Sequence, residues 1–305
     1  MGQERYLLAP CSMHLALCTL PRSTMNGIYD YRLPSPALRE YVRMFQIIGC
    51  EFPASLAVLP VKAYWPRAEN CLSLFPKDPE KIEYGFDGKP LESPRSRLYG
   101  QHTLATNRHV GRDFMVFQIQ FQPGALFRLT GLPISELTNT FIDAEAIFST
   151  EIQRVNERLS YTRHYTEMIP IVEDFLIYLI HKARHKYARP IDKAAQYLLN
   201  YPAGVPGLDW LADQACLSQR QFYRQFVESS GASPKLYSRI ARFENAMKLK
   251  NARPNLDWLS VAVELGYYDY QHLVRDFKEF TQLTPNAFYE AEAKSPERVF
   301  GVAET

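Results

Sequence analysis

Residues 208–228 read Leu-Asp-Trp-Leu-Ala-Asp-Gln-Ala-Cys-Leu-Ser-Gln-Arg-Gln-Phe-Tyr-Arg-Gln-Phe-Val-Glu, and this stretch decides the fold of the C-terminal part of the chain. Leu211 and Ala215 lie one helical turn apart, and Phe222 and Phe226 repeat that spacing further along. Apolar residues at positions i and i+4 share one face of a helix. The stretch therefore predicts two short helices, each with one buried face, joined by a tight turn.

The second predicted helix has a sharp start and a polar outer face. Ser218 followed by Gln221 is a capping box, in which each side chain bonds the backbone N–H of the other residue. With the two phenylalanines turned inward, Arg220, Tyr223 and Arg224 face outward. Arginine can bond guanine through two atoms, and the major groove of DNA admits a helix. This helix is therefore suited to reading bases in a major groove.

The same pattern occurs a second time, about fifty residues later. Ala262 repeats Ala212 at an offset of fifty residues, and the offset becomes fifty-one from the second helix onward. The matching pairs are Phe222 and Leu273, Arg224 and Arg275, Phe226 and Phe277, Ser233-Pro234 and Thr284-Pro285, and Tyr237 and Phe288. An internal repeat of this kind indicates two helix-turn-helix units. Two ordinary helical hairpins with solvated arginines are the alternative.

The second copy of the pattern resembles a known signature. Residues 266–280 read Gly-Tyr-Tyr-Asp-Tyr-Gln-His-Leu-Val-Arg-Asp-Phe-Lys-Glu-Phe, and Thr284-Pro285 follows. With them, residues 190–290 resemble the DNA-binding domain of AraC/XylS-type transcriptional regulators. The resemblance implies an all-α domain with two helix-turn-helix units joined by a long helix over residues 234–250. Cys216 is a departure, because the turn of such units often carries glycine.

The resemblance also implies which residues touch DNA. Base contacts are expected from Arg220, Tyr223 and Arg224 in the first unit, and from Gln271 and Arg275 in the second. Glutamine suits adenine, and arginine suits guanine. Candidates for contacts with the phosphate backbone are Ser218, Gln219, Lys235, Arg239, Tyr270 and His272.

The two units differ in charge. Residues 217–253 carry eight basic side chains and two acidic ones, whereas residues 254–290 carry two basic and six acidic ones. The whole chain has a formal net charge of only +2. Because phosphate contacts supply much of the affinity for DNA, we expect the first unit to bind DNA more strongly than the second.

Length and composition are those of a globular chain with two domains. The chain has 305 residues, of which 46% are hydrophobic. Its cysteines are odd in number and include no Cys-x-x-Cys pair, which favours a reduced, cytoplasmic protein over a disulfide framework or a zinc site. No apolar run reaches about 18 residues, so no membrane partner is expected. The five cysteines are Cys11, Cys18, Cys50, Cys71 and Cys216.

The chain is expected to divide into five segments. The first is either a disordered leader or the product of a start assigned too early, with Met25 as the true start. The segments are the leader at 1–24, a sensor or dimerisation domain at 25–180, a basic linker at 181–189, the DNA-binding domain at 190–294 and a polar tail at 295–305.

The N-terminal domain is predicted to be α+β, as a small curled sheet or a cupin-like barrel with helices. Residues 115–121 are the clearest strand, because Phe117, Ile119 and Phe121 alternate with glutamines. Further strands are expected at 55–64, 71–75 and 97–104, and helices at 36–47, 126–129, 150–159, 169–180 and 191–199.

Two of these helices carry further signals. Thr150 and Gln153 have the spacing of a capping box, which predicts a helix start at residue 150. The helix at 169–180 has one apolar stripe. That stripe is expected either to be buried in its own domain or to form a dimer.

The N-terminal domain also resembles the sensor domain of one branch of AraC-type regulators. The resemblance rests on residues 61–66, 70–75 and 99–100. It extends to Gln-Phe-Gln-Pro-Gly-Ala-Leu-Phe-Arg-Leu at 120–129 and Leu-Pro-Ile-Ser-Glu-Leu at 132–137. It implies a cupin-like sensor module without naming a ligand.

A metal centre in this domain would need clustered histidines and carboxylates, and the candidates are His102, His109, Glu83 and Asp113. No His-x-His pair is present, so ordinary hydrogen-bonded histidines are expected, with no metal and no cofactor. The sequence also lacks a Gly-rich phosphate loop, a nucleophile elbow and a His-Glu-x-x-His motif, so an enzyme is not predicted.

An apolar ligand pocket is the second kind of site considered for this domain. Its aromatic residues suit the lining of such a pocket, although they suit an ordinary core equally well. The candidates are Tyr64, Trp65, Phe75, Tyr84, Phe86, Tyr99, Phe117 and Phe121.

Together these features predict a cytoplasmic, sequence-specific transcriptional regulator that binds double-stranded promoter DNA. By family resemblance it would be an activator that recruits RNA polymerase. The N-terminal domain would respond to a small-molecule effector or to a partner. The alternative is that this domain is a protein-interaction or homodimerisation module that binds no small molecule.

Overall fold

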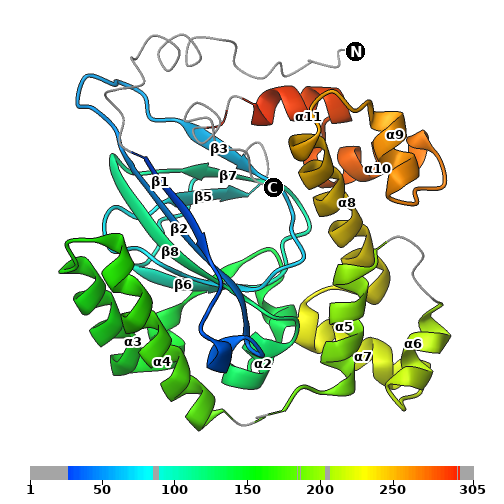
Figure 1. Ribbon diagram of the computed structural model, residues 1–305, viewed down its shortest axis with the longest axis horizontal. Helices are drawn as coiled ribbons and strands as arrows, with labels where there is room; N and C mark the ends of the chain where they lie inside the picture. Colours follow the sequence, from blue (N-terminus) through cyan, green and yellow to red (C-terminus); the bar gives the residue numbers. More distant parts are fainter. Residues whose placement is uncertain are drawn as a thin grey trace.

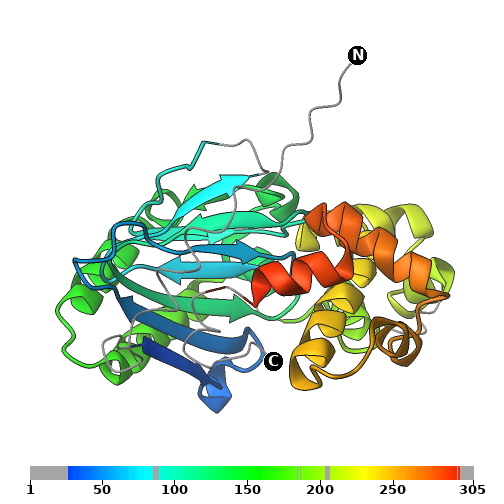
Figure 2. The same ribbon diagram turned by 90° about the horizontal axis from the view of Figure 1, so that it is seen from above.

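The structure is a computed structural model that describes residues 27–84, 89–183, 185, 187–202, 207–293 and 295. It has a strand-rich N-terminal unit, from β1 to α4, and a helical C-terminal unit, from α5 to α11 (Figure 1). The helical unit lies against one end of the sheets, as the second view shows (Figure 2). The predicted leader at 1–24 and the tail beyond Ser295 lie outside the described residues.

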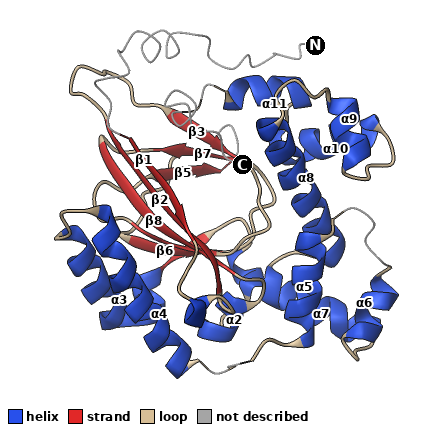
Figure 3. Ribbon diagram, in the orientation of Figure 1, coloured by secondary structure: helices blue, strands red, loops and turns tan. Residues whose placement is uncertain are grey.

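The described strands form two antiparallel sheets (Figure 3). The larger has the order β1-β2-β8-β4-β6-β9 and the smaller the order β3-β7-β5. The bounds are β1 Gly27–Arg32, β2 Val42–Glu51, β3 Val61–Tyr64, β4 Cys71–Leu74, β5 Lys81–Tyr84, β6 Ser96–Tyr99, β7 Thr106–His109, β8 Asp113–Phe121 and β9 Phe141–Asp143. The N-terminal unit is thus α+β with curled sheets, as predicted.

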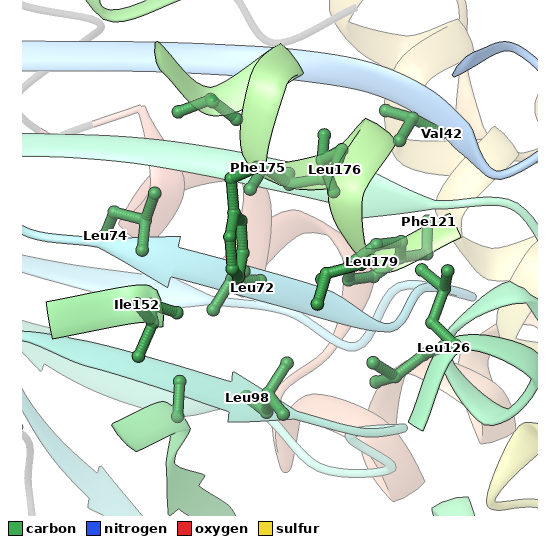
Figure 4. Close-up of a cluster of buried hydrophobic side chains, with 14 of the residues drawn as sticks. Val42, Leu72, Leu74, Leu98, Phe121, Leu126, Ile152, Phe175, Leu176 and Leu179 are labelled. Carbon is green, nitrogen blue, oxygen red and sulfur yellow. The ribbon is translucent and has the colours of Figure 1, made fainter. Parts of the chain in front are cut away.

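One face of the larger sheet forms the main core of the N-terminal unit. Alternate residues such as Phe45, Leu72 and Phe117 are fully buried there. In Figure 4, side chains of α3 and α4 point toward those of the sheet. The helices that cover this face are α2 (Ala125–Thr130), α3 (Ala144–Ser160) and α4 (Met168–Lys182).

The apolar stripe predicted at 169–180 belongs to this core. Val172 and Leu176 of α4 are fully buried, and the ring of Phe175 packs edge-to-face on Phe148 of α3, with centroids 5.6 Å apart. Of the two expectations for this stripe, burial in its own unit is therefore the one that the structure bears out.

The opposite face of the larger sheet is polar, yet it is buried as well. Gln118 and Gln120 alternate with the apolar residues of β8 as predicted, but their exposed fractions are only 4% and 2%. The smaller sheet covers this face. A cavity between the two sheets is lined by Ser73 and Gln118 from one sheet and by Tyr64 and Arg108 from the other. The interior between the sheets is therefore polar.

Residues 36–47 do not form the predicted helix. They contain a single 3-10 turn, η2 (Pro36–Leu38), after which the chain enters strand β2 at Val42. The apolar spacing of this segment fits a helix, but β2 is rich in β-branched and aromatic residues. It also pairs on both sides, with β1 and with β8. Pairing with two neighbouring strands therefore overrides the local helical pattern.

Other predicted elements agree with the structure in kind and differ in length. The strands expected at 71–75 and 115–121 are β4 and β8, and those expected at 55–64 and 97–104 are the shorter β3 and β6. The helices expected at 126–129, 169–180 and 191–199 are α2, α4 and α5. Within the predicted basic linker, α4 continues to Lys182, and Arg184 and Lys186 lie outside the described residues.

The helix expected at 150–159 is part of the longer α3, and its start was predicted wrongly. Asp143 caps α3, and its carboxylate accepts a hydrogen bond from the backbone N–H of Glu145 at 2.9 Å. Ser149 interrupts the helix with a φ of 50°. Thr150 and Gln153 bond neighbouring glutamates and do not cap each other. Sequence spacing alone placed the start at this internal break.

The C-terminal unit contains the two predicted helix-turn-helix units, α6–α7 and α9–α10, joined by α8. Phe222, Phe226, Leu273 and Phe277, which the repeat pairs, are all fully buried. The bounds are α5 Pro190–Asn200, α6 Leu208–Gln214, α7 Gln219–Ser230, α8 Pro234–Ala252, α9 Trp258–Glu264, α10 Tyr270–Thr281 and α11 Pro285–Glu292.

The predicted caps begin these helices. The hydroxyl of Ser218 accepts from the backbone N–H of Gln221 at 3.3 Å, and the Gln221 side chain accepts from the backbone N–H of Ser218 at 3.1 Å. Ser233 and Thr284, each followed by proline, cap α8 and α11. The capping signals read from the sequence are therefore confirmed in this unit.

The turn inside each unit has one residue in the left-handed region. Cys216 has a φ of 54°, and Gly266, fifty residues on, has a φ of 65°. The extra residue of the second unit follows Gly266, because Asp269 caps α10 fifty-one residues after Ser218 caps α7. Cys216 thus adopts the conformation that glycine adopts in the other copy, in spite of its Cβ.

The two units share a core. Trp65 and Ala68, which follow β3, are buried among helices of the C-terminal unit. The Trp65 indole packs edge-on against the ring of Phe288 in α11, with centroids 6.2 Å apart. The backbone N–H of Ala68 donates to the Glu244 carboxylate of α8 at 3.0 Å. The segment after β3 is therefore part of the C-terminal unit's packing.

Further hydrogen bonds join the N-terminal unit to each helix-turn-helix unit. The Thr138 hydroxyl donates to the carbonyl oxygen of Gly231, at the end of α7, over 2.7 Å. The backbone N–H of Ala105 donates to the carbonyl oxygen of Phe280 in α10 over 2.8 Å. Both helix-turn-helix units are thus bonded to the N-terminal unit.

We predict that Cys216→Gly stabilises the protein by about 0.5–1 kcal/mol. The substitution removes the Cβ that clashes in the left-handed conformation. This gain is expected to exceed the loss that comes from the greater entropy of glycine in the unfolded chain. Gly266→Ala should destabilise it by about 1 kcal/mol for the converse reason. Denaturant unfolding would measure both changes. Cys216→Ala is the control, since it removes the thiol and keeps the Cβ. An equal gain for Cys216→Ala would contradict the backbone explanation.

His102 should make stability sensitive to acid. Burial, together with Arg108 and Arg97, lowers its pKa from 6.5 to about 3. Below pH 6.5 His102 becomes protonated in the unfolded chain but stays neutral in the folded protein. The free energy of unfolding therefore decreases as the pH falls toward 3. His102→Gln should remove about 2 kcal/mol of the loss between pH 7 and pH 5. Denaturant unfolding at a series of pH values would measure this. An equal loss of stability between pH 7 and pH 5 in the variant and the parent protein would refute the prediction.

Candidate nucleic-acid interface

Helix α7 presents the three residues predicted to read bases in the first unit. Phe222 and Phe226 turn inward and are fully buried, and this orients the rest of the helix. Arg220, Tyr223 and Arg224 are exposed on its other side. A short, sharply capped helix with two arginines and an aromatic side chain on its free face can enter a major groove and bond base edges.

Helix α10 presents the corresponding residues of the second unit. Leu273 and Phe277 are fully buried, whereas Gln271 and Arg275 are exposed. Arg275 occupies the position in α10 that Arg224 occupies in α7, fifty-one residues earlier. The two helices therefore show equivalent faces with different donors and acceptors.

Helix α8 fixes the position of α10 relative to α7. Its 19 residues span about 28 Å at about 1.5 Å per residue. The ring of Phe243 in α8 packs edge-to-face on Phe277 and Phe280 of α10, with centroids 4.8 and 5.3 Å away. A rigid helix of this length suits two groove-reading helices placed near one DNA repeat apart, about 34 Å.

Most acidic residues of the second unit are engaged within the fold. Asp257 and Asp269 cap α9 and α10, and the backbone N–H groups that they accept lower the pKa of both carboxyls. Glu264 pairs with Arg253. These carboxylates therefore also stabilise the helices of their own unit. The weaker DNA binding expected of this unit stays a prediction.

Arg239, a predicted phosphate contact, also joins α8 to α10, and its contact with phosphate stays a prediction. Its guanidinium donates to Asp276 at 2.7 Å and to Glu279 at 2.6 Å. Burial raises the pKa of the Asp276 carboxyl, and the hydrogen bonds from Arg239 lower that of Glu279. This structural role was not visible in the sequence, because it needs the tertiary contact between residues far apart in the chain.

The other candidates for backbone contacts lie in different surroundings. Ser218 and Gln219 are exposed at the start of α7, and Lys235 is exposed near the start of α8. The His272 ring bonds the capping carboxylate of Asp269 at 2.8 Å. Tyr270 is partly buried against the core of the C-terminal unit.

Arg242 is a basic residue of this surface that the sequence reading did not single out. Its guanidinium lies over the ring of Tyr267, 5.0 Å from the centroid. It lines a cavity of about 390 Å³ together with Tyr223, Lys235 and Arg239. The spacing of residues 235, 239 and 242 along one helical face is the signal that could have found it.

Among the aromatic residues predicted to line a ligand pocket, only some face the space between the sheets. Tyr64 lines the cavity there. Trp65 is instead part of the C-terminal unit's core, and Phe117 and Phe121 belong to the core under α3 and α4. Phe75 packs with Phe114, Tyr84 and Tyr99 pack with His102, and Phe86 lies outside the described residues.

The histidines and carboxylates considered for a metal centre are dispersed. His109 bonds Glu83 at 2.9 Å, and Asp113 bonds Lys77 at 2.7 Å. His102 is buried between aromatic rings. Within the part of the chain that is described, no group of three or more His, Cys, Asp or Glu could hold a metal ion.

None of the helices in the described ranges combines the length and the apolar character that crossing a membrane requires.

Comparison with known protein families gives two matches. Residues 211–291 match the model of a helix-turn-helix domain, and residues 31–143 match that of a domain of unknown function, DUF6597. Over 134 residues the chain is 25% identical to an uncharacterized HTH-type transcriptional regulator of Haemophilus influenzae. This match covers 44% of the chain and 42% of the relative, so the chain spans less than half of the relative's length.

Among solved structures, the chain is similar to ToxT of Vibrio cholerae bound to an unsaturated fatty acid. The TM-score is 0.47 at 12% identity, over 86% of this chain and 98% of that one. It is also similar to the DNA-binding domain of AdpA in complex with a target DNA, with a TM-score of 0.31 at 21% identity, over 35% of this chain and 95% of that one. Residues 211–291 are therefore a helix-turn-helix domain, and their internal repeat and signature residues resemble the AraC/XylS type.

Proposed function

We propose that this protein is a sequence-specific DNA-binding transcriptional regulator. The observation that carries the proposal is the pair of capped helices, α7 and α10, whose equivalent faces expose Arg224 and Arg275. Such helices read base edges in the major groove. Because α8 is about 28 Å long, we expect it to space these helices by about one DNA repeat, so that the binding site would consist of two boxes about ten base pairs apart.

The N-terminal unit is proposed to control this DNA binding. It contacts α8 through the hydrogen bond from Ala68 to Glu244, and it touches α11 through Trp65. A change in the N-terminal unit would therefore act directly on the helix that spaces the two DNA-reading helices. In this proposal the protein works in the cytoplasm as an activator that recruits RNA polymerase, and it needs no enzymatic step.

The alternative function for the N-terminal unit is protein interaction or homodimerisation without a small-molecule effector. The buried polar space between its sheets favours an effector. A small molecule that binds the folded protein raises its thermal stability by mass action, whereas an interaction module responds only to its partner. Sedimentation of the full chain would reveal a dimer independently.

Random-site selection with the full chain tests the main proposal. The full chain is needed because Trp65 and Ala68 contribute to the core of the C-terminal unit. Enrichment of one motif with two boxes about ten base pairs apart is expected. Enrichment of a single box would assign reading to one unit, and no enrichment with a steep salt dependence would reduce the activity to nonspecific binding.

Arg224→Ala and Arg275→Ala should each weaken binding to the selected site by about 1–3 kcal/mol and relax specificity at one base position. The reason is the loss of a two-atom contact with a base edge. Fluorescence anisotropy with a set of single-base variants of the site would measure both effects. Arg154→Ala, at an exposed position of α3, is the control. Equal weakening on every sequence would show a phosphate contact instead.

Arg239→Ala should lower the stability of the protein by about 2 kcal/mol, because it leaves the buried Asp276 carboxylate without its main partner. Arg253→Ala breaks an exposed pair with Glu264 and should cost less than about 1 kcal/mol. Denaturant unfolding would compare the two. Unchanged stability with uniformly weaker DNA binding would contradict the structural role and support the predicted phosphate contact of Arg239.

A further inference from the structure

Helices α7 and α10 end in the same way and meet the N-terminal unit there. Gly231 follows α7 with a φ of 79°, and Gln282, fifty-one residues on, follows α10 with a φ of 61°. Carbonyl oxygens at the end of a helix have no partner within the helix. Those of Gly231 and Phe280 accept hydrogen bonds from the N-terminal unit. The two copies of the internal repeat are thus bonded to the N-terminal unit at equivalent ends.

Two short segments of the N-terminal unit supply the donors. Residues 101–105 lie between β6 and β7, and the backbone N–H of Ala105 bonds the end of α10 over 2.8 Å. Residues 138–139 lie before β9, and the hydroxyl of Thr138 bonds the end of α7 over 2.7 Å. We call these two segments together the clamp.

Asn139 joins the two segments of the clamp. Its side-chain oxygen accepts from the backbone N–H of Thr103 at 2.8 Å, and its side-chain nitrogen donates to the Thr103 hydroxyl, also at 2.8 Å. Its backbone N–H donates to the carbonyl oxygen of Gln101 at 3.1 Å. Asn139 has a φ of 55°, a left-handed conformation that asparagine tolerates better than most residues. These bonds fix the position of one clamp donor relative to the other.

The clamp is also bonded to the segment that meets α8. Gln101 is fully buried, and its side-chain nitrogen donates to the carbonyl oxygen of Arg67 at 2.6 Å. Arg67 lies between Trp65, which packs on α11, and Ala68, which bonds α8. A shift of the clamp would therefore disturb these contacts as well.

Together these contacts form a closed ring around the two helix-turn-helix units. Phe226 of α7 packs on Tyr237 of α8, with ring centroids 5.6 Å apart. Phe243 of α8 packs on Phe277 of α10, with ring centroids 4.8 Å apart. The clamp joins the C-terminal ends of α7 and α10 and completes the ring. A rotation of one unit relative to the other must therefore strain the clamp as well as α8.

Small rotations of this kind are large on the scale of DNA. Helix α8 is about 28 Å long, so a rotation of about 10° at one end moves the other end by about 5 Å. Successive base pairs are about 3.4 Å apart along the helix axis. A rotation of this size is therefore enough to bring a recognition helix to the next base pair.

We infer that the clamp sets the spacing between the two DNA boxes, with Thr138 and Asn139 as positioning residues. The inference rests on the proposed function, because it requires that α7 and α10 both read bases. The clamp holds the C-terminal ends of these helices, whereas recognition helices meet bases mainly through their N-terminal residues. Arg224 and Arg275 stay exposed beside it. The N-terminal unit thus determines which box spacings the C-terminal unit recognises.

A set of DNA sites that differ only in spacer length tests this inference. Each site contains the two boxes selected by the full chain, separated by the selected spacer or by one base pair more or less. The parent protein should bind the selected spacer at least about tenfold more tightly than the other two. Thr138→Val and Asn139→Gly remove the side-chain bonds of the clamp, and glycine keeps the left-handed backbone accessible. In both variants the ratio should fall to about threefold or less.

Thr162→Val is the matched control. The Thr162 hydroxyl donates to the carbonyl oxygen of Leu159 at the end of α3 over 2.7 Å, which is the kind of bond that Thr138 makes to the end of α7. This variant should lose a similar amount of stability and keep the spacer preference of the parent protein. An equal loss of spacer preference in Thr162→Val, or a preference like that of the parent in both clamp variants, overturns the inference. Circular dichroism checks that each variant folds.

Hydrogen exchange in the absence of DNA tests the clamp by a second route. Because Asn139 joins both contacts, Asn139→Gly should speed amide exchange at the ends of α7 and α10, and at Ala105, by at least about tenfold. Thr162→Val should leave all three regions unchanged. Faster exchange at only one of the two helix ends, or at neither, would show that the two contacts are independent and would overturn the inference.

The outcomes can be separated from those of the proposed function. Selection of a single box, or of none, by the parent protein contradicts the two-box reading and the inference with it. Equal binding of all three spacers by the parent protein removes the inference alone. A two-box site whose spacing the clamp variants still require does the same and leaves the proposed function standing.

Discussion

The burial of Trp65 in the C-terminal unit is the contact on which the arrangement of the molecule depends. The indole packs on Phe288, and the adjoining backbone N–H of Ala68 bonds Glu244 in α8. Burial alone would raise the pKa of Glu244, but Lys248 and Arg43 hold that pKa below its usual value, so the acceptor stays charged. Since α8 in turn packs on α10, a continuous series of contacts runs from the strands to both helix-turn-helix units. The DNA-reading faces are thus placed by the N-terminal unit as well as by their own short helices.

The C-terminal unit could be predicted almost completely, because its signals are local. A capping box such as Ser218 with Gln221 and an apolar pair such as Phe222 with Phe226 each act within one helical turn. The N-terminal unit was harder for the opposite reason. Residues 36–47 have an apolar spacing that fits a helix. Pairing with two other strands instead makes the part from Val42 onward the start of β2. The contact of Trp65 with the other unit, and the ion pairs of Arg239, join residues far apart in the chain. No local sequence pattern predicts these contacts.

Charge counted along the sequence does not show what each charged side chain contacts. The second helix-turn-helix unit is rich in acidic residues, but most of them cap helices or pair with arginine. In the N-terminal unit, the glutamines of β8 fit one face of an ordinary strand, yet both are buried, and Gln118 lines the cavity between the two sheets. In both places the role of a polar side chain depends on its contacts in the folded protein.

The shared core also affects how the protein is made. Ribosomes synthesise Trp65 long before Phe288, and at about 5–20 residues per second the interval is roughly ten to forty seconds. During that time the N-terminal unit can assemble its sheets, but the indole and its neighbours have no helices to pack against. The nascent chain therefore carries an exposed apolar segment until α11 emerges. Completion of the C-terminal unit would then bury this segment as the final step of folding.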